Sequence, residues 1–442
     1  MKKVLVIGCA RSGYWVSLLL NDKGYDVTIT DKDKINEKEE LINKGISVYD
    51  EGHLDALKTI KWDFIVKNPG IAYHNAFVST FIEKNIPIYA EIEVASWYAP
   101  NFSYGAITGT NGKTTITTLL YELLKTKGKA YASGNIGIPL SETLMKHDDG
   151  KADIALEISA FQLLGCPTFR PLVSVITNLT SDHLDYFENI DEYFKAKTLV
   201  YRNQKDDDWF IKNIDDQNIV EYCDNVQCKV ISMSIEKKAD LMVYDGWVTL
   251  FDVPLFNIAN LRLVGKHNLQ NAMMAAAMAY KMGVLPQAID EVISSFDAIE
   301  HRIEYVTELN GVKYYNDSKG TNTDSTVIAL KSFDTPVILL AGGYDKHTGF
   351  SALYDYTDSI KKLIVFGATK TELAKLKDDA IICMNLKEAT DIAYRLANEG
   401  DIVLFSPACA SYDQFNNYEE RGRIFKQYVQ DLASREGEKH DI

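Results

Sequence analysis

The sequence predicts an α/β protein built on parallel sheets, because short apolar runs alternate with helical stretches along its whole length. The chain has 442 residues, of which 46% are hydrophobic, so each third can bury a core of its own. We therefore expect three domains: a Rossmann-like N-terminal domain over residues 1–95, a central P-loop ATP-binding domain with a parallel sheet over 96–299, and a C-terminal Rossmann-like domain over 300–442.

Apolar runs of strand length stand in each expected domain. In chain order they are residues 4–7, 27–30, 64–66, 105–108, 154–158, 173–177, 337–341, 363–366 and 402–405. Two turn dipeptides, Asp245-Gly246 and Asn310-Gly311, each separate a pair of strand-like runs. Such dipeptides favour the tight turns of β-hairpins, so we expect a hairpin at each.

Composition excludes several classes of partner. The formal net charge is −15, and an acidic surface repels phosphate groups, so neither nucleic acid nor an anionic membrane is expected. The longest uncharged window, residues 94–112, is too polar for a membrane span, and Gly8 interrupts the first apolar run too early for a signal peptide. Cys223 and Cys228 lack a second pair and a nearby histidine, which disfavours zinc. We expect free thiols, a cytoplasmic location and a monomer.

A glycine loop, Gly8-Cys-Ala10-Arg-Ser12-Gly13, follows the first predicted strand, and Asp31 ends the second. The pattern is similar to the G-x-G-x-x-G fingerprint of dinucleotide-binding domains, whose acidic residue bonds a ribose. Ala10 replaces the glycine that lets the backbone approach a pyrophosphate closely, which weakens the case for NAD. We expect Gly8, Ser12, Gly13 and Asp31 to bind a nucleotide-containing ligand; the alternative is a plain tight turn.

The sharpest motif is a second glycine loop, which joins a predicted strand to a predicted helix over residues 116–125. It reads Ile107-Thr-Gly109-Thr110-Asn111-Gly112-Lys113-Thr114-Thr115. Backbone amides of such a loop wrap a polyphosphate, Lys113 reaches the terminal phosphates, and the Thr114 hydroxyl can ligate Mg²⁺. Ile107 stands where the standard P-loop has glycine, so this is a variant loop; the alternative is a glycine-rich turn. We expect residues 109–115 to bind ATP.

Acidic and histidine side chains follow the next strands of the central domain. Glu157 lies at the carboxyl end of one strand, and Asn178-Leu-Thr-Ser-Asp182-His183 follows the other. Ligands bind at the carboxyl ends of parallel strands, and oxygen ligands suit Mg²⁺. We therefore expect Glu157 and His183 at the ATP site. For a lone histidine the alternative is an ordinary core or surface residue.

A helix is predicted to begin at Asn189, which has capping-box spacing to Glu192. Its apolar stripe contains Ile190, Phe194 and Tyr201, and Lys197 falls on the same stripe, whereas Lys195 points towards water. An inward-facing ammonium is unfavourable unless it is paired or chemically altered. A snorkelling lysine is an equally good interpretation of the periodicity alone.

These segments resemble the Mur ligases, ATP-dependent amide-forming enzymes of bacterial cell-wall precursor synthesis, and they occur in the family's order. The matching segments are residues 108–115, 134–137, 157–163, 178–183, 194–197, 265–271, 301–302 and 316–322. The short N-terminal domain, Asn68-Pro69-Gly70-Ile71-Ala72, and residues 406–415 further resemble the branch that joins D-glutamate to UDP-N-acetylmuramoyl-L-alanine. The Asn-Pro-Arg signature of the diaminopimelate- or lysine-adding branch is absent.

The resemblance implies that ATP converts the L-alanyl carboxylate to an acyl phosphate, which the amine of D-glutamate attacks. The first domain would bind the UDP moiety, the second ATP and Mg²⁺, and the third the amino acid. Lys113, His183 and Lys197 would be catalytic, and the Mg²⁺ ligands would be Thr114, Glu157, His183 and a carbamylated Lys197. Further ATP contacts would be Asn268, Asn271, Arg302 and Asp317. Further substrate contacts would be Lys32, Asn68, Pro69, Gly70, Asn135, Gly137, Ser159, Gln162, Thr321, Lys346, Ser411 and Tyr418.

Departures from the family pattern are confined to the uridine contacts. Asn68 stands where the family has serine, and Lys32-Asp33 stands where the family has a different pair. Two other classes of protein remain alternatives. A nicotinamide-dependent oxidoreductase would explain residues 8–13 but neither the ATP loop nor Lys197. A P-loop regulatory module without chemistry would leave Lys197 and residues 406–415 unexplained.

Overall fold

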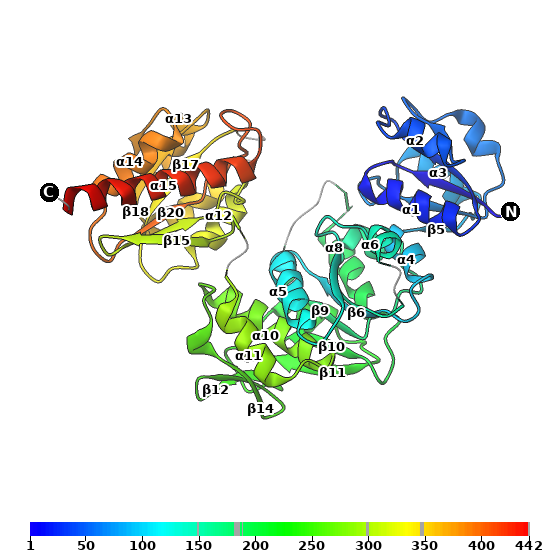
Figure 1. Cartoon of the computed structure of the whole chain (residues 1–442), viewed down its shortest axis with the longest axis horizontal. Helices are drawn as coiled ribbons and strands as arrows, with labels where there is room; N and C mark the ends of the chain where they lie inside the picture. Colours follow the sequence, from blue (N-terminus) through cyan, green and yellow to red (C-terminus); the bar gives the residue numbers. More distant parts are fainter. Residues whose placement is uncertain (148–149, 181–185, 188, 298–299, 345–348, 441–442) are drawn as a thin grey trace. The chain divides into compact units, whose positions relative to one another are not determined.

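The computed structural model describes residues 1–147, 150–180, 186–187, 189–297, 300–344 and 349–440, with side chains described through residue 434. Two predicted site residues, His183 and Lys346, lie outside these ranges. The described residues form three α/β sheets in which most strand pairs are parallel, which confirms the predicted fold class (Figure 1). No helix in the described ranges combines the length and apolar character that crossing a membrane requires.

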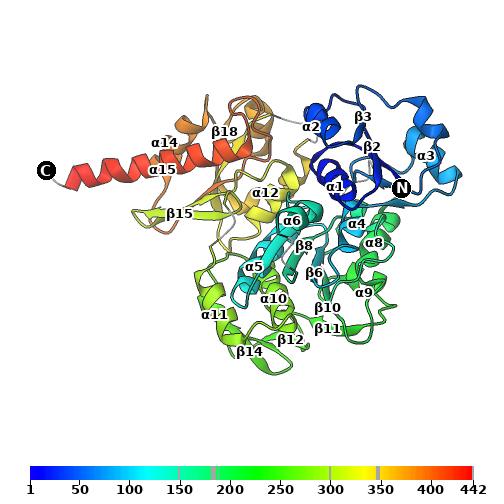
Figure 2. The ribbon, with the colours of Figure 1, turned by 45° about the vertical axis from the view of Figure 1, so that its right-hand side comes forward.

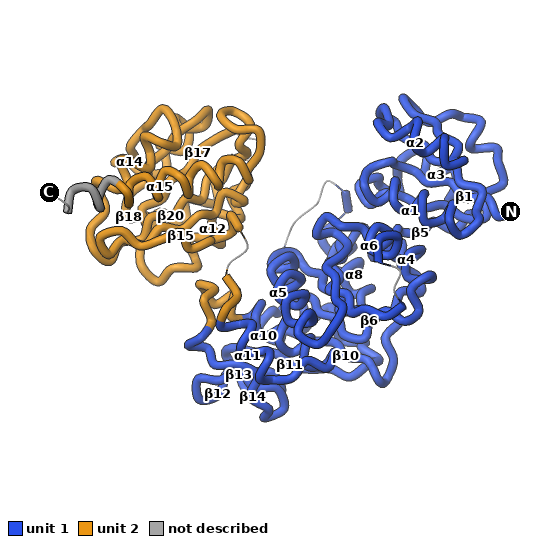
Figure 3. Tube along the Cα trace, viewed as in Figure 1, with its two compact units in different colours: residues 1–260, 270–294 blue, residues 261–269, 295–442 orange. Residues whose placement is uncertain are grey.

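Contacts divide the chain into two compact units, residues 1–260 with 270–294 and residues 261–269 with 295–442 (Figure 3). The first unit contains the first two sheets and the second unit contains the third. The domain boundaries expected near residues 95 and 299 stay predictions.

The first sheet is parallel throughout, with strand order β3-β2-β1-β4-β5. Its strands are β1 (Lys3–Ile7), β2 (Asp26–Thr30), β3 (Ser47–Tyr49), β4 (Phe64–Lys67) and β5 (Ile88–Tyr89). Its helices are α1 (Arg11–Asp22), α2 (Lys38–Asn43), η1 (Asp55–Thr59), α3 (Ala76–Glu83) and α4 (Glu91–Ser96). Helix α1 approaches β1 so closely that a Cβ on Gly13 would lie 1.9 Å from the Gly8 carbonyl oxygen.

The second sheet has the order β14-β13-β12-β11-β10-β9-β6-β8-β7 and becomes antiparallel only at β12–β14. The predicted hairpin at Asp245-Gly246 is confirmed, since Tyr244 pairs with Trp247. Its strands are β6 (Ser103–Thr108), β7 (Ala130–Gly134), β8 (Asp153–Glu157), β9 (Val173–Ile176), β10 (Trp209–Asn213), β11 (Lys229–Met233), β12 (Leu241–Tyr244), β13 (Trp247–Leu250) and β14 (Val253–Asn257).

Helices cover both faces of this sheet. They are α5 (Lys113–Lys125), α6 (Leu140–Lys146), α7 (Ala160–Leu163), α8 (Ile190–Thr198), η2 (Leu199–Tyr201), α9 (Gln217–Tyr222), η3 (Ile258–Asn260), α10 (Lys266–Lys281) and α11 (Pro286–Ser295). Helices α5 and α10 lie side by side against β6 (Figures 1 and 2). A Cβ on Gly105 of β6 would lie within 3.2 Å of both Leu120 of α5 and Met278 of α10. This close packing fixes the start of α5, and with it the ATP loop, against the sheet.

The third sheet has the order β15-β16-β20-β17-β18-β19 and is parallel except for the predicted hairpin at Asn310-Gly311. Its strands are β15 (Glu304–Leu309), β16 (Val312–Asn316), β17 (Val337–Gly342), β18 (Ile360–Phe366), β19 (Ile381–Ile382) and β20 (Ile402–Phe405). Its helices are α12 (Thr323–Leu330), η4 (Ser351–Ser359), α13 (Lys370–Leu373), η5 (Ala374–Leu376), α14 (Leu386–Leu396) and α15 (Tyr418–His440).

Each sheet brings predicted site residues to one edge. Gly8, Asp31 and Asn68 follow three adjacent strands of the first sheet. In the second sheet Gly109 follows β6 and Glu157 ends the neighbouring β8, and in the third Asp317 follows β16. These are carboxyl ends of parallel strands, where α/β proteins bind their ligands.

Candidate active site

The ATP loop is held by the end of strand β9. Gly109 has a φ of +139°, and a Cβ there would lie 1.9 Å from Thr177 Oγ1. Gly112 has a φ of +82°, and its Cβ would meet Asn271 Oδ1 on α10 at 2.5 Å. Asn178 anchors the intervening residues, because the Thr110 N–H donates to its backbone oxygen and the Asn111 N–H to its side-chain oxygen. Both glycines are therefore required by close contacts as well as by backbone conformation.

Two lysines converge on a single carbonyl of this loop. Lys113 Nζ donates to Gly109 O at 3.0 Å and to Thr110 O at 2.8 Å, and Lys197 Nζ donates to Gly109 O at 2.8 Å. Lys197 is 1% exposed and lies over the Tyr193 ring, with Nζ 4.2 Å from its centroid. Two lysine side chains, one from α5 and one from α8, therefore hold the backbone of this loop.

Helix α8 explains why Lys197 points inward. Asn189 caps it by accepting the Glu192 N–H at 3.0 Å, as the sequence predicts. Lys197 is buried, whereas Lys195 is exposed and pairs with Asp191 at 2.7 Å, so both predicted orientations are confirmed. The expectation for Ile190 is wrong: it is 37% exposed, because it is the first residue of the helix.

Glu157 offers a buried oxygen to a cation. Its Oε1 accepts a hydrogen bond from Asn135 Nδ2 at 2.8 Å, whereas its Oε2 is buried and has no partner among the described residues. An unpartnered carboxylate oxygen near the phosphate loop fits Mg²⁺, and Thr114 lies in the first turn of α5. Within the described ranges no group of three or more His, Cys, Asp or Glu side chains could hold a metal.

The other predicted substrate contacts of the central region have structural partners. Ser159 and Gln162 form a reciprocal capping box on α7: the Gln162 N–H donates to Ser159 Oγ, and the Ser159 N–H donates to Gln162 Oε1 at 2.9 Å. Gly137, with a φ of +116°, closes a turn by donating its N–H to Gly134 O at 3.1 Å. That turn orients Asn135 towards Glu157.

A cavity of about 450 Å³ lies at the carboxyl edge of the first sheet. Its predicted lining residues are Gly8, Asp31, Lys32, Asn68 and Gly70, and it also includes Ala10, Asp33, His53 and His74. The Asp31 carboxylate accepts hydrogen bonds from the Cys9 N–H at 2.6 Å and the Asp33 N–H at 3.0 Å, so it joins the two loops that follow β1 and β2.

Asn68 connects the loop after β4 to the glycine loop. Its Nδ2 donates to Ser12 Oγ at 3.3 Å, and its Oδ1 accepts the Gly70 N–H at 3.0 Å. Pro69 lies between these bonds, and Lys32 is an exposed side chain. The structure therefore brings the predicted uridine-contacting residues around one cavity.

In the second unit, Asp317 lies between two strand ends. Its Oδ2 accepts from Ser406 Oγ at 2.6 Å, and its Oδ1 accepts from the Ile303 N–H at 3.3 Å. Burial raises the pKa of Asp317 to about 7, although the charges of Arg302 and Arg421 oppose this shift. The predicted ATP contacts Arg302 and Asp317 are thus close enough to interact.

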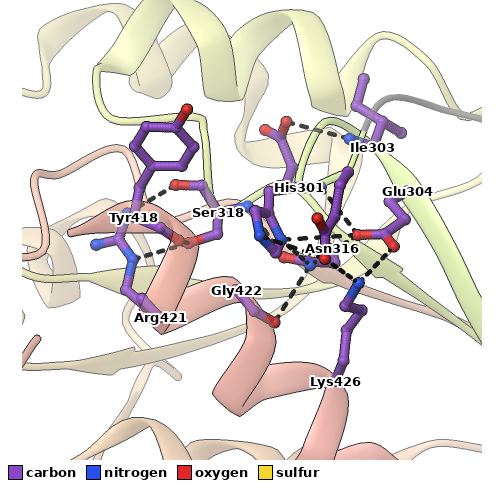
Figure 4. Close-up of polar contacts among 11 residues, drawn as sticks. His301, Ile303, Glu304, Asn316, Ser318, Tyr418, Arg421, Gly422 and Lys426 are labelled. Carbon is purple, nitrogen blue, oxygen red and sulfur yellow. Dashed lines mark hydrogen bonds and ion pairs between the residues drawn. The ribbon is translucent and has the colours of Figure 1, made fainter.

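His301 precedes this pair in a left-handed backbone conformation, with a φ of +67°. It is 2% exposed, and Asn316 Nδ2 lies 2.9 Å from its Nδ1 (Figure 4). Burial lowers the pKa of His301. Asn316 Nδ2 also bonds Glu304, which pairs with Lys426 of α15, so the segment before β15 is fixed by the C-terminal helix.

A buried arginine that sequence analysis missed links two loops of this unit. Arg421 has no exposed surface; its Nε and Nη2 donate to Ser318 Oγ and Ser318 O at 3.0 and 2.8 Å, and its Nη1 donates to Cys409 O at 3.0 Å (Figure 4). Burial lowers the pKa of Arg421 to about 10. No local sequence signal indicates this role, because Ser318 lies 103 residues away in sequence.

The remaining predicted residues of this unit lie near that arginine or at the start of α10. Ser411 is buried two residues after Cys409, and Tyr418 O accepts a hydrogen bond from Ser318 Oγ at 2.8 Å. The Thr321 N–H donates to Lys319 O. Asn268 Nδ2 donates to Val264 O at 2.7 Å.

Comparison with known proteins identifies two regions of the chain. Residues 107–279 match the Mur ligase middle domain, and residues 301–409 match the domain described as Mur ligase, glutamate ligase domain. Relatives called UDP-N-acetylmuramoylalanine–D-glutamate ligase, from Bacillus subtilis (strain 168) and Lactobacillus acidophilus, are each 40% identical to this chain. The first match covers 95% of this chain and 96% of the relative, and the second covers 98% of both.

Solved structures with lower sequence identity share the fold. UDP-N-acetylmuramate-alanine ligase from Thermotoga maritima has a TM-score of 0.57 at 17% identity, over 98% of this chain and all of that one. The structure of UDP-N-acetylmuramoyl-L-alanyl-D-glutamate–2,6-diaminopimelate ligase has a TM-score of 0.58 at 16% identity. That match covers 93% of this chain and 94% of the other. Both similarities extend across the whole α/β architecture.

Proposed function

Because the chain belongs to the Mur ligase family, we propose that it is the ATP-dependent ligase that joins D-glutamate to UDP-N-acetylmuramoyl-L-alanine in peptidoglycan precursor synthesis. The observation that carries this proposal is the ATP loop, where Lys113 and the buried Lys197 meet at the Gly109 carbonyl. The relatives of the same name, which match nearly the full chain, support the choice of substrates.

The reaction must activate a carboxylate, which is a poor electrophile at neutral pH. Transfer of the γ-phosphoryl group of ATP to the L-alanyl carboxylate gives an acyl phosphate and ADP. The amine of D-glutamate then attacks the acyl carbon, and the tetrahedral intermediate loses phosphate and a proton to leave the amide. Lys113 and the loop amides would stabilise the negative charge on the transferring phosphoryl group.

Magnesium would be held by Glu157 Oε2 and the Thr114 hydroxyl. When bound, it supplies positive charge that offsets the repulsion between phosphate oxygens and the incoming carboxylate. We further propose that the neutral amine of Lys197 reacts with CO₂ to form a carbamate and a proton. Burial of Lys197 disfavours its charged form and so favours the neutral amine, and the carbamate, with His183, would hold a second Mg²⁺.

The other two sheets would hold the other substrates. The cavity bounded by Gly8, Asp31 and Asn68 would take the UDP moiety. In the third sheet, Lys346, Ser411 and Thr321 would bind the two carboxylates of D-glutamate, and Arg302 with Asp317 would contact ATP. We also propose a cytoplasmic location, since all six cysteines are free thiols, as a reducing compartment requires.

Release of inorganic phosphate in the presence of ATP, Mg²⁺ and UDP-N-acetylmuramoyl-L-alanine tests this function across a panel of amino acids. We expect turnover with D-glutamate and none with L-glutamate, lysine or diaminopimelate. L-glutamate should fail because inversion at the α-carbon misplaces either a carboxylate or the amine. Lys346→Ala should raise the KM for D-glutamate far more than the KM for ATP. Comparable turnover with another amino acid would move the protein to another branch of the family.

A further inference from the structure

A lysine outside the predicted site lies buried beneath the loop that follows β4. Lys67, the last residue of that strand, is 3% exposed. Its Nζ donates to Ile71 O at 2.6 Å and to Asn68 O at 3.2 Å, and it lies 4.4 Å from the centroid of the Tyr73 ring. No carboxylate in the described ranges forms an ion pair with it, and burial lowers its pKa from 10.5 to about 8.

A buried cation without a paired charge is costly, and methionine would fill a similar volume at this position without that cost. Its hydrogen bonds show what the lysine does in the free protein. By bonding the carbonyls of both Asn68 and Ile71, it closes residues 68–71 into one fixed loop. Tyr186 supports the same carbonyl, since its hydroxyl donates to Ile71 O at 3.3 Å.

The loop that Lys67 fixes lines the cavity at the edge of the first sheet. Asn68, Gly70 and Ile71 all face it, and Asn68 in turn bonds Ser12 of the glycine loop. The other ionisable lining residues include the exposed Lys32 and two acids, Asp31 and Asp33, and the acids disfavour an anionic ligand. A cation directly behind the loop offsets their charge, and a low-dielectric position makes its field stronger than that of an exposed lysine.

We infer that Lys67 is a positioning residue for the UDP-linked substrate: as a buried cation it fixes residues 68–71 and supplies the positive potential that the pyrophosphate requires. This inference rests on the proposed function, which places the UDP moiety in that cavity. Lys67 acts through the Asn68 and Ile71 carbonyls and through space, without touching the reacting atoms.

A pH dependence follows from this arrangement. The UDP-linked substrate binds more tightly when Lys67 is protonated. Its affinity therefore falls as the pH rises through the pKa of Lys67 in the free protein, which is about 8. If the neutral side chain binds about tenfold more weakly, as expected of methionine, the Kd at pH 9 is about fivefold higher than at pH 7.

Other titratable groups surround the loop, and the exposed Lys32 and Asp33 also line the cavity. Tyr73 and His74 belong to the loop itself, Tyr186 packs on it from the central region, and Asp31 and His53 lie across the cavity. Burial raises the pKa of Tyr73, and it raises the pKa of Tyr186 to about 12. Burial lowers the pKa of His53 below its usual value. These three groups therefore titrate outside the range from pH 7 to 9.

The test is calorimetric titration of the full-length protein with UDP-N-acetylmuramoyl-L-alanine, without ATP, at pH 7, 8 and 9. We compare the wild type with Lys67→Met and with Lys61→Met, an exposed lysine of the same region. Lys67→Met should bind about tenfold more weakly at pH 7 and should not show the loss of about fivefold between pH 7 and 9 that is expected of the wild type. Lys61→Met should behave as the wild type. Loss of the uracil N3 proton at alkaline pH affects all three proteins equally.

Each outcome decides the inference. A wild-type Kd that does not change between pH 7 and 9 overturns it, even if Lys67→Met fails to fold. Equal affinity and equal pH dependence in Lys67→Met and the wild type overturn it while leaving the proposed function intact. Failure of the wild type to bind the UDP-linked substrate at all overturns both. In active variants, the KM for ATP should stay unchanged while the KM for the UDP-linked substrate rises.

Discussion

Replacing Glu91 by glutamine should make the protein more stable at alkaline pH. Glu91 is the first residue of α4 and is 4% exposed. Its Oε1 accepts a hydrogen bond from the Ser141 N–H at 2.5 Å, whereas its Oε2 is buried and has no partner among the described residues. Burial raises the pKa of Glu91 from 4.5 to about 7; the Ser141 hydrogen bonds oppose the shift and the charge of Glu142 adds to it.

The sign and size of the change in unfolding free energy follow from how many protons the folded and unfolded states bind. Between pH 4.5 and 7 the folded protein holds a proton that the unfolded chain has lost, so stability falls as pH rises through this window. Above it, the shift corresponds to about 3 kcal/mol of destabilisation. Glutamine stays neutral and can still accept the Ser141 hydrogen bond. We therefore expect Glu91→Gln to exceed the wild type in unfolding free energy by about 3 kcal/mol at pH 8.5, and to equal it at pH 4.

Urea unfolding followed by tryptophan fluorescence at both pH values measures this difference. Glu93→Gln is the matched control, because Glu93 is equally buried on the same helix but accepts hydrogen bonds from Trp97, Thr168 and Phe169. Removing that charge should destabilise the protein by about 2 kcal/mol. The reasoning is refuted if Glu91→Gln is less stable than the wild type at pH 8.5, or if its advantage is the same at pH 4.

The other predictions concern activity. Lys197→Ala should abolish turnover, and a small carboxylic acid in the buffer should restore part of it, while Lys195→Ala stays active; full activity of Lys197→Ala would contradict a catalytic role. Gly13→Val should weaken binding of the UDP-linked substrate by about tenfold or more in a calorimetric titration, because its side chain overlaps the Gly8 carbonyl. ATP affinity should not change. Lys113→Ala should lose phosphoryl transfer but keep its affinity for the UDP-linked substrate; normal phosphate release would exclude the role assigned to Lys113.

The fold was largely predictable because its main strands are buried on both faces. Such strands read as continuous apolar runs, and the run predicted at residues 337–341 corresponds to β17, Val337–Gly342. The short strands β5 and β19, of two residues each, were not predicted; both lie at the edge of a sheet and are only partly buried. Strand ends differed by a residue: Glu157 ends β8, although the apolar run continues to Ile158.

The candidate site was predictable where local spacing determines which way a side chain points. Helical periodicity gave the inward orientation of Lys197, because Phe194 and Tyr201 on the same stripe are apolar. Periodicity could not reveal Lys67, which ends a strand whose residues are all buried. It also could not reveal Glu91 or Arg421, since their hydrogen-bond partners lie 50 and 103 residues away in sequence.

Under the proposed function, Arg421 has a consequence for how the amino acid is selected. Its guanidinium bonds both Ser318 and Cys409 and so links the segments after β16 and β20, and the Asp317–Ser406 hydrogen bond links them a second time. A wall built in this way is rigid before any ligand arrives, so little conformational entropy is lost on binding. Discrimination then depends on fit to a fixed template rather than on a loop that adapts, and an amino acid of the wrong shape gains nothing from rearrangement.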